Sequence, residues 1–502
     1  MNCGYPHDNA VTGVGRQIRL GATAVSVTTE ATLRLPEVPA AHYLLPTENH
    51  MLSFLLLVIL LVGVSTILWT TVGLCRVVAA AARRNDDRAI LIDYPEPQDV
   101  AVVIAAHNEE LVISNTITSL DSLVERNQIF VVSDGSRDQT AAIARRFGVN
   151  VLELHANRGK AGAIVELLDS FEIASRFEVV LLLDADTQLT PQYLETGLPL
   201  FSDPDVVAVA GRASSLISPR ASVLGRFLLD YRNRVYIAMQ YLFKFGQAAK
   251  AANVVTIVPG FASMYKSRIL SSIDIAAPGL KIEDYNMTFE IHAKKLGAIA
   301  FHPNAAIAIT QDPDELGQYI SQVERWNLGF WQTVGRHRFR FEKFWLALGL
   351  FIVELLISST LLILLVPALI LSLTAAAVHA IGLDPTGSAI IVTDLLPPLL
   401  LLLGILLPDY LLTVLAAVVA RQPRYLVVGL AFPLMRILDA FLCIRALVTA
   451  LSANPTHGRW VSPQRRSIET VPASQRPRAI EGSLVRTGAE HPIPVAMAHN
   501  RD

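Results

Sequence analysis

The stretch Phe177-Glu-Val-Val-Leu-Leu-Leu-Asp-Ala-Asp186 decides the fold class of this chain. Its apolar run, residues 179–183, is typical of a strand that is buried on both faces of a sheet. Similar runs occur at residues 99–106, 127–136, 147–154 and 205–212. Polar segments of helical length separate them, and this alternation predicts a parallel sheet covered by helices. We therefore expect an α/β domain in which ligands bind at the carboxyl ends of the strands.

The composition indicates a membrane protein. Of the 502 residues, 52% are hydrophobic, which is above the usual range for a soluble domain. The net charge of −2 gives no indication of nucleic-acid binding. The three cysteines, Cys3, Cys75 and Cys443, are too widely spaced to form a CxxC pair. Neither a disulfide framework nor a zinc site is therefore expected.

Apolar segments flank the α/β domain. The segment 49–80 is long enough to cross a bilayer, which takes roughly 20 apolar residues, and several arginines follow it. Because positive charge clusters on the cytoplasmic side, the domain that follows should be cytoplasmic. We expect a disordered tail (1–48), a transmembrane helix (49–80), the α/β domain with interfacial helices at its end (95–343), a C-terminal transmembrane bundle (344–452) and a second disordered tail (453–502).

The number of crossings in the C-terminal bundle stays open at three or four. Residues 345–381, 390–420 and 425–451 each contain enough apolar residues to cross a bilayer. Three crossings would leave the basic tail outside, against the positive-inside tendency. Either the first of these segments forms two crossings, or the last one, which carries Arg436, Asp439 and Arg445, lies at the membrane surface.

Two carboxylates follow the strand of the opening stretch. Asp184 and Asp186 are two residues apart, and alternation along an extended chain puts their side chains on the same side. Two carboxylates so close repel each other unless a cation lies between them. The pair therefore predicts a Mg²⁺ or Mn²⁺ ion that shares oxygen ligands with substrate phosphates. A solvent-exposed acidic turn is the alternative.

Two further acidic positions follow strands or loops. Asp134 closes the run 127–136 and precedes a Gly-Ser turn, which suits a ribose or a base; an Asx turn that caps a helix is the alternative. Glu283 and Asp284 follow a glycine-containing loop. One of them could act as a general base toward an attacking hydroxyl, a step worth roughly 10²–10⁴ in rate. Alternatively, both mark the acidic start of a helix, where they meet the helix dipole favourably.

The stretch SQVERWNLGFW, residues 321–331, lies just before the long apolar segments. Arg325 offers a planar fork suited to diphosphate oxygens, and Trp326 offers a flat face on which a sugar ring can stack. Gln322 lies three and four residues before them, so the three side chains are neighbours on a helix. An interfacial aromatic belt is the alternative explanation for the tryptophans.

Seven motifs together resemble those of membrane-bound family 2 glycosyltransferases, in the processive branch that contains cellulose, chitin, hyaluronan and poly-N-acetylglucosamine synthases. They are AAHNEE (105–110), SDGSRDQT (133–140), NRGKAGA (157–163), DAD (184–186), PGFASMYKS (259–267), IEDYNMT (282–288) and QVERW (322–326). The resemblance covers about residues 98–335. It implies a GT-A fold and an inverting single displacement on a nucleotide-activated sugar, usually a UDP-sugar. Ser133 stands where the family often has an aspartate.

The resemblance also implies a role for each matching position. Asp284 would be the general base, and Asp186 would bind the metal. The donor would be bound by Glu109, Asp134, Lys160, Asp184 and Arg325, and the acceptor by Gly260, Phe261, Ala262, Gln322 and Trp326.

The main hypothesis from the sequence is a multi-pass glycosyltransferase of the cell membrane that uses Mg²⁺ or Mn²⁺. It would extend a polysaccharide or a lipid-linked acceptor at the cytoplasmic face. A single-addition transferase that makes a glycolipid is one alternative, and a non-catalytic scaffold that binds sugar nucleotides is another. The expected partners are a nucleotide-sugar donor, the acceptor and membrane lipid, without nucleic acid; accessory export subunits stay open.

Overall fold

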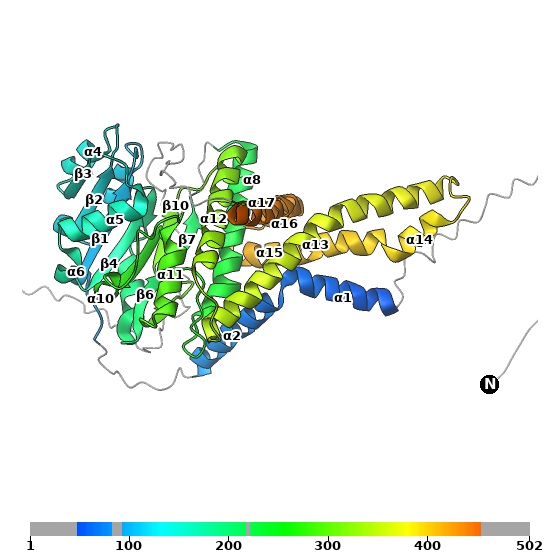
Figure 1. Cartoon of the computed structure of the whole chain (residues 1–502), viewed down its shortest axis with the longest axis horizontal. Coiled ribbons are helices and arrows are strands. Elements are labelled where there is room, and N and C mark those ends of the chain that lie inside the picture. Colours follow the sequence, from blue (N-terminus) through cyan, green and yellow to red (C-terminus); the bar gives the residue numbers. More distant parts are fainter. Residues whose placement is uncertain (1–47, 83–92, 217–220, 453–502) are drawn as a thin grey trace, which may run out of the picture. The chain divides into compact units, whose positions relative to one another are not determined.

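The structure is a computed structural model that describes residues 48–82, 93–216 and 221–452 (Figure 1). Apart from Glu48, the predicted tails, 1–48 and 453–502, lie outside the described residues. All described residues belong to one compact unit. They form an α/β domain and a set of long apolar helices.

The α/β domain is built on a seven-stranded sheet. Its order is β3 (Asn150–Leu154), β2 (Ile129–Asp134), β1 (Val100–Ala106), β4 (Val179–Asp184), β8 (Ala262–Lys266), β6 (Val206–Ala210) and β9 (Ala298–Ala300). The β1 strand pairs in parallel with β2 and β4, whereas β8 runs antiparallel to its neighbours β4 and β6. The predicted α/β fold class is confirmed. The sheet is mixed rather than wholly parallel, because β8, a strand that was not predicted from the sequence, runs antiparallel to β4 and β6.

Alternate residues of the central strands fill two apolar cores, one on each face of the sheet. Val103 and Ala105 of β1 face the first core, and Val102 and Ile104 face the second. The first core is covered by α5 (Gly159–Ser170), α6 (Ile173–Arg176), α10 (Ser267–Leu270) and α11 (Glu283–Ala293). The second is covered by α3 (Ile113–Ser119), α4 (Thr140–Arg146) and α7 (Tyr193–Gly197). Burial on both faces explains why the strand sequences are continuous apolar runs.

The strand order reverses between β1 and β4. The chain continues from β1 to β2 and β3 on one side, and then returns to β4 on the other side of β1. Ligands of open α/β sheets bind at the carboxyl ends of the strands where such a reversal occurs. His107 and Asp184 lie at these two ends.

A second, three-stranded sheet follows the end of β4 directly. It consists of β5 (Thr187–Leu189), β10 (Ile307–Thr310) and β7 (Arg212–Ser215), with β10 in the middle. Because β5 begins immediately after Asp186, its hydrogen bonds to β10 hold this carboxylate between the two sheets.

Two long helices of the α/β domain contact the apolar helices. They are α8 (Val223–Ala238) and α12 (Leu316–Arg336). The α8 helix continues into a π-helical segment, Met239–Lys244, and the short α9 (Phe245–Gln247). The α12 helix packs along α17 (Phe432–Ser452), and α8 packs against α15 (Pro398–Ala420). The QVERW motif is therefore helical, as expected, and next to the apolar segments.

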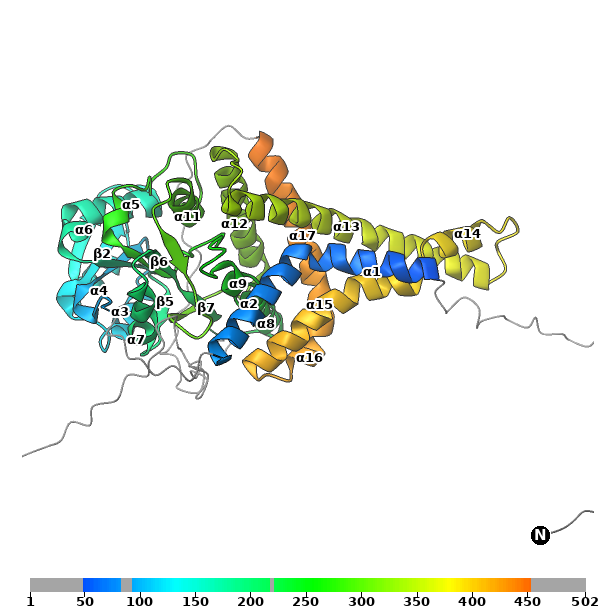
Figure 2. The same cartoon turned by 90° about the horizontal axis from the view of Figure 1, so that it is seen from below.

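Among residues 48–82, 93–216 and 221–452, three helical segments are long and apolar enough to cross a membrane: Lys343–Ala380, Ser388–Ala420 and Tyr425–Ser452. The first is α13; the second contains α14 (Ser388–Leu395) and α15; the third contains α16 (Tyr425–Val428) and α17. Figure 2 shows α1 (Glu48–Val62) beside α13, and α17 crossing α13. Apolar side chains such as Leu364, Ile370 and Val418 are exposed on α13 and α15. Large exposed apolar surfaces of this kind are typical of contact with lipid.

The N-terminal apolar segment is helical but not straight. The helices α1 and α2 (Val64–Ala82) meet at Gly63, where the axis bends by 70°. Gly63 has a φ of 87°, a conformation that glycine adopts without the steric cost of a Cβ atom. The backbone N–H of Ser65 donates to both carboxylate oxygens of Glu354 in α13, at 3.0 Å each. The bend is thus held by a side chain of the C-terminal bundle.

Candidate active site

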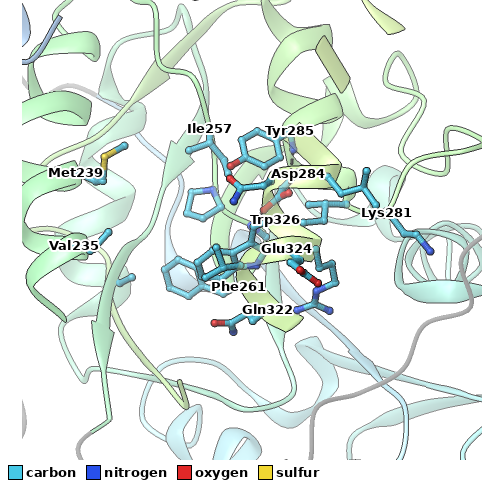
Figure 3. A pocket seen from close by; sticks show the side chains of 18 of the residues that line it. Val235, Met239, Ile257, Phe261, Lys281, Asp284, Tyr285, Gln322, Glu324 and Trp326 are labelled. Carbon is cyan, nitrogen blue, oxygen red and sulfur yellow. Dashed lines mark hydrogen bonds between the residues drawn. The ribbon is translucent and has the colours of Figure 1, made fainter. Parts of the chain in front are cut away.

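A single cavity of about 1290 Å³ lies at the carboxyl ends of β1 and β4 and extends to the apolar helices. Figure 3 shows Asp284, Gln322 and Trp326 around one part of it. The predicted site residues that line it are Glu109, Lys160, Asp184, Asp186, Gly260, Phe261, Asp284, Gln322, Arg325 and Trp326. The fold therefore brings residues from six separate motifs to one space.

Lys160 is the centre of an ion network at the strand ends. Its ammonium lies 2.7 Å from Asp184 Oδ1 and 2.8 Å from Glu283 Oε1. Burial by itself would lower the pKa of Lys160, but these carboxylates raise it above its ordinary value. Burial by itself would raise the pKa of Glu283, but the charge and the hydrogen bond of Lys160, together with a backbone hydrogen bond and the charge of Arg325, lower it below its ordinary value. Lys160 is therefore held as a cation between the DAD motif and the start of α11.

The two carboxylates of the DAD motif lie in unequal surroundings. Burial raises the pKa of Asp184, and the neighbouring Asp186 raises it further, whereas Lys160 opposes both effects. Asp186 accepts a hydrogen bond from Thr187 Oγ1 at 3.3 Å. Within the described ranges, no three His, Cys, Asp or Glu side chains are grouped so as to hold a metal ion. The protein alone thus offers two carboxylates, a set that suits a magnesium-like ion whose other ligands are phosphate oxygens and water.

Asp284 lies at the beginning of α11 and faces the cavity. Its Oδ2 accepts a hydrogen bond from the backbone N–H of Gly260, and its Oδ1 accepts one from that of Tyr285, both at 3.0 Å. Burial, followed by the charge of Glu283, raises the pKa of Asp284 to about 6. A carboxylate that titrates near neutral pH is well matched to general-base work.

The loop before β8, which contains Gly260 and Phe261, contacts Asp184 and lies against the Lys160–Glu283 ion pair. The backbone N–H of Asp184 donates to the carbonyl oxygen of Phe261 at 2.9 Å. A Cβ atom at Gly260 would lie 3.0 Å from the ammonium of Lys160 and 3.2 Å from Glu283 Oε1. A larger residue at this position would therefore have to push the ion network aside.

Two predicted site residues do not line the cavity. Ala262 is fully buried at the start of β8, and the second core surrounds it. Asp134 is also fully buried, and its Oδ1 accepts a hydrogen bond from the backbone N–H of Arg158 at 2.7 Å. Arg158 itself lines the cavity. Asp134 thus fixes the loop that forms this wall, so that any contact with a nucleoside would be made mainly through the loop.

The QVERW side chains meet an arginine that the sequence did not single out. Arg232 of α8 donates to Gln322 Oε1 at 2.8 Å, and its guanidinium lies 4.5 Å from the centre of the Trp326 ring. Asp312 lies 3.8 Å from Arg232 Nε, and both side chains are buried. The signal for Arg232 was present: α8 carries charged and polar residues at 230–234, directly after an apolar run. No motif marked it.

The far end of the cavity is lined by polar residues of the apolar helices. Glu354 of α13, Asp409 of α15 and Arg436 of α17 all contribute. Arg234 of α8 lies 2.8 Å from Asp409 Oδ1, and both side chains are buried. Asp439 of α17 accepts hydrogen bonds from Tyr231 and Tyr319, at 2.8 and 2.7 Å. From the sequence, Arg436 and Asp439 indicate only a helix at the membrane surface, whereas the structure places both at the cavity.

Comparison with known proteins shows which protein family this chain resembles. The family described as "Glycosyltransferase like family 2" matches residues 97–329. Poly-beta-1,6-N-acetyl-D-glucosamine synthase from Staphylococcus epidermidis is 25% identical over 266 residues, which cover 49% of this chain and 61% of the relative. The protein of the same name from Staphylococcus aureus (strain COL) is 25% identical over 260 residues, which cover 50% and 59%. The chain thus spans about three fifths of the length of these relatives.

Solved structures of sugar transferases are also similar. The mannosyltransferase PcManGT from Pyrobaculum calidifontis, in complex with GDP-Man and Mn2+, gives a TM-score of 0.42 at 17% identity, covering 78% of this chain and 99% of that one. Glucosyl-3-phosphoglycerate synthase from Mycobacterium tuberculosis gives 0.28 at 19% identity, covering 50% and 81%. The mixed sheet and the family match together confirm the predicted GT-A class of fold. Residues 97–329 of this chain are similar to the glycosyltransferases of family 2.

Proposed function

We propose that the protein is an inverting, metal-dependent glycosyltransferase that moves a sugar from a UDP-sugar to a growing polysaccharide at the cytoplasmic face of the cell membrane. One observation carries the proposal: Asp186, Asp284 and Arg325 line the same cavity although they come from distant parts of the chain. A metal ligand, a general base and a diphosphate fork must act on one donor molecule, and this arrangement would allow it.

The proposed reaction is a single displacement. The hydroxyl oxygen of the acceptor attacks C1 of the donor sugar, and Asp284 takes the proton of that hydroxyl. The bond between C1 and the diphosphate oxygen breaks, and the nucleoside diphosphate leaves with the electron pair. Attack from the face opposite the leaving group inverts the configuration at C1. A pKa of about 6 would keep Asp284 ionised, and therefore basic, at neutral pH.

Charge on the leaving diphosphate would be balanced from two sides. Asp184 and Asp186 would hold a Mg²⁺ or Mn²⁺ ion, which when bound supplies positive charge to the phosphate oxygens. Arg325 would supply a second positive charge through its planar fork. Fixed charge at the position where negative charge develops is usually the largest contribution to catalysis.

A polysaccharide acceptor is supported by the relatives and by the cavity. The relatives are named poly-beta-1,6-N-acetyl-D-glucosamine synthases. The cavity continues among the apolar helices, where Glu354, Asp409 and Arg436 line it. Carboxylates and guanidinium groups suit the hydroxyls of a glycan, so the product chain would leave between these helices.

A single-addition transferase that acts on a lipid-linked acceptor is the second candidate. Leu355, Leu362 and Leu412 also line the membrane end of the cavity, and they suit a lipid chain better than a glycan. Product size separates the two candidates. A polymer or a ladder of products supports the polysaccharide, whereas a single increment supports the glycolipid.

The proposed topology has α13 and the pair α14–α15 crossing the membrane, with α17 at its cytoplasmic surface. Close packing of α17 along α12, and the hydrogen bonds from Tyr231 and Tyr319 to Asp439, support an interfacial position. With α1 and α2 as one bent crossing, the chain would return to the cytoplasmic side at Ser452. The arginines that follow would then obey the positive-inside tendency.

The test is turnover by the purified full chain in detergent. We expect release of nucleoside diphosphate from one member of a panel of UDP-sugars in the presence of Mg²⁺ or Mn²⁺, and loss of release when the metal is chelated. Sugar nucleotides that stay intact across the whole panel would instead support a binding scaffold and would overturn the proposal.

A further inference from the structure

Arg232 holds one face of α12 in place. Its guanidinium contacts three α12 side chains: Nη2 donates to Gln322 Oε1 at 2.8 Å, and the rings of Trp326 and Tyr319 are centred 4.5 and 4.7 Å away. Residues 319, 322 and 326 follow one another at spacings of three and four, so they share a helix face. One cation from α8 thus contacts both the first and the last residue of the QVERW motif.

A buried counter-ion fixes the guanidinium itself. Asp312, just before α12, lies 3.8 Å from Arg232 Nε. The hydroxyl of Tyr236 donates to Asp312 Oδ1 at 2.8 Å. Loss of one partner from a buried ion pair leaves an uncompensated charge and is strongly destabilising. Arg232 and Asp312 are therefore a rigid support, and a test must keep the positive charge.

This contact decides which group Gln322 presents to the cavity. A guanidinium has only donors, so the amide oxygen of Gln322 must face Arg232. The amide NH₂ group is then left for the cavity, which Gln322 lines. Trp326 is similarly restricted: the guanidinium covers one face of its ring, and only the other face is left for a ring of the acceptor.

We propose that Arg232 is a positioning residue for the acceptor, a role that rests on the proposed transferase function. It turns Gln322 so that the NH₂ group donates to an acceptor oxygen, and it keeps the Trp326 ring flat against the cavity wall. On the donor side, Lys160, Asp184 and Glu283 are held by ion pairs of their own.

The first test replaces the planar guanidinium of Arg232 by an ammonium group, which keeps the positive charge. In Arg232→Lys we expect the KM for an oligosaccharide of the transferred sugar to rise about tenfold, which corresponds to one hydrogen bond to a charged group. Acceptor-independent hydrolysis of the donor should stay within about twofold. Arg226→Lys, at an exposed position of the same helix, is the matched control and should leave both values unchanged.

The second test keeps a hydrogen-bond acceptor for Arg232 and replaces the NH₂ donor of Gln322 by a negatively charged oxygen. In Gln322→Glu a carboxylate would still accept from Arg232, so the melting temperature should be preserved. The NH₂ group is lost, so the acceptor KM should rise as in Arg232→Lys. A purely structural role for the contact predicts no such rise, and an unchanged acceptor KM in Gln322→Glu would overturn the proposal.

A double-mutant cycle completes the test. If Arg232 acts through Gln322, the variant with both Arg232→Lys and Gln322→Glu should be about as impaired in acceptor KM as either single variant. Fully additive effects would overturn the coupling. A wild-type protein without turnover would overturn the proposed function together with this role. Turnover in the wild type with an unchanged acceptor KM in Arg232→Lys would overturn this role alone.

Discussion

The two halves of the cavity are held in different ways. At the strand ends, Asp184 and Asp186 are fixed by the backbone of β4 and β5, and Lys160 forms an ion pair with Asp184. On the helix side, Gln322 and Trp326 are fixed by one side chain of another helix, Arg232. The first half is thus a product of sheet topology, and the second depends on contacts between side chains. Substitutions in the two halves should therefore separate donor chemistry from acceptor binding.

Asp284→Asn should have the largest effect, because it removes the proposed base, on which transfer between the two halves would depend. We expect the rate of sugar transfer to fall by about 10²–10⁴, while binding of the nucleoside diphosphate is retained. Transfer by radiolabel incorporation and nucleotide binding by calorimetry would measure the two quantities. Asp169→Asn, at an exposed position of α5, is the control. Full activity of Asp284→Asn would mean that another group is the base.

Asp186→Asn should be the next most severe and should act on the donor half alone. We expect a loss of about 10²–10³ in kcat, the usual effect of removing one group that stabilises developing charge. The Mn²⁺ concentration that gives half-maximal activity should rise as well. Titration of activity with Mn²⁺ in both proteins would measure this, and identical metal dependence would contradict a role of Asp186 in metal binding.

The pH dependence of kcat/KM tests whether the charge of Lys160 influences the pKa of the proposed base, Asp284. Asp284 must be ionised to act, so kcat/KM should fall as the pH drops through about 6. Lys160 lowers the pKa of Asp284, and Lys160→Met should therefore move the acid limb to higher pH. Lys250→Met removes a lysine that is exposed on the surface and should leave the limb in place. If the acid limb does not move in Lys160→Met, the charge of Lys160 does not control the pKa of Asp284.

Arg445→Gln should have the smallest effect. Arg445 of α17 lies 2.7 Å from Glu324 Oε1 in α12, but the side chains are 59% and 31% exposed. Exposed pairs of this kind contribute about 0–1 kcal/mol, so the acceptor KM should change by less than about fivefold. A larger change would mean that α17 controls the helix half of the cavity more tightly than the buried Arg232 network suggests.

The sequence predicted the strand-end half better than the helix half. A strand buried on both faces must be an apolar run, so β1, β2 and β4 and the acids after them could be located. The strand β8 was missed, because ASMYK mixes small, polar and apolar residues. Arg232 was missed for a different reason: its partners Gln322 and Trp326 lie 90 or more residues further along the chain, and no local pattern reports such a contact.

The bend at Gly63 could not be predicted either. A single glycine inside a long apolar run gives no signal, since straight membrane helices also contain glycine. The bend is held by Glu354, whose contact with Ser65 spans 289 residues of sequence. Ala262 and Asp134 show a different limit of prediction from sequence. Both residues lie in motifs, but a motif does not say whether a side chain faces the cavity or supports the loop that does.

The close packing of α2 on the α/β domain has a practical consequence. A Cβ atom at Gly246 would lie only 2.0 Å from the carbonyl oxygen of Trp69, so the two backbones touch. Trp69 belongs to the same apolar cluster as Phe330, Trp331 and Cys443. A protein trimmed to residues 95–343 would leave Phe330 and Trp331 facing water, and it would self-associate rather than remain soluble. Inhibitor screening should therefore use protein that keeps α2, α13 and α17, in detergent or lipid, because these helices cover the apolar cluster.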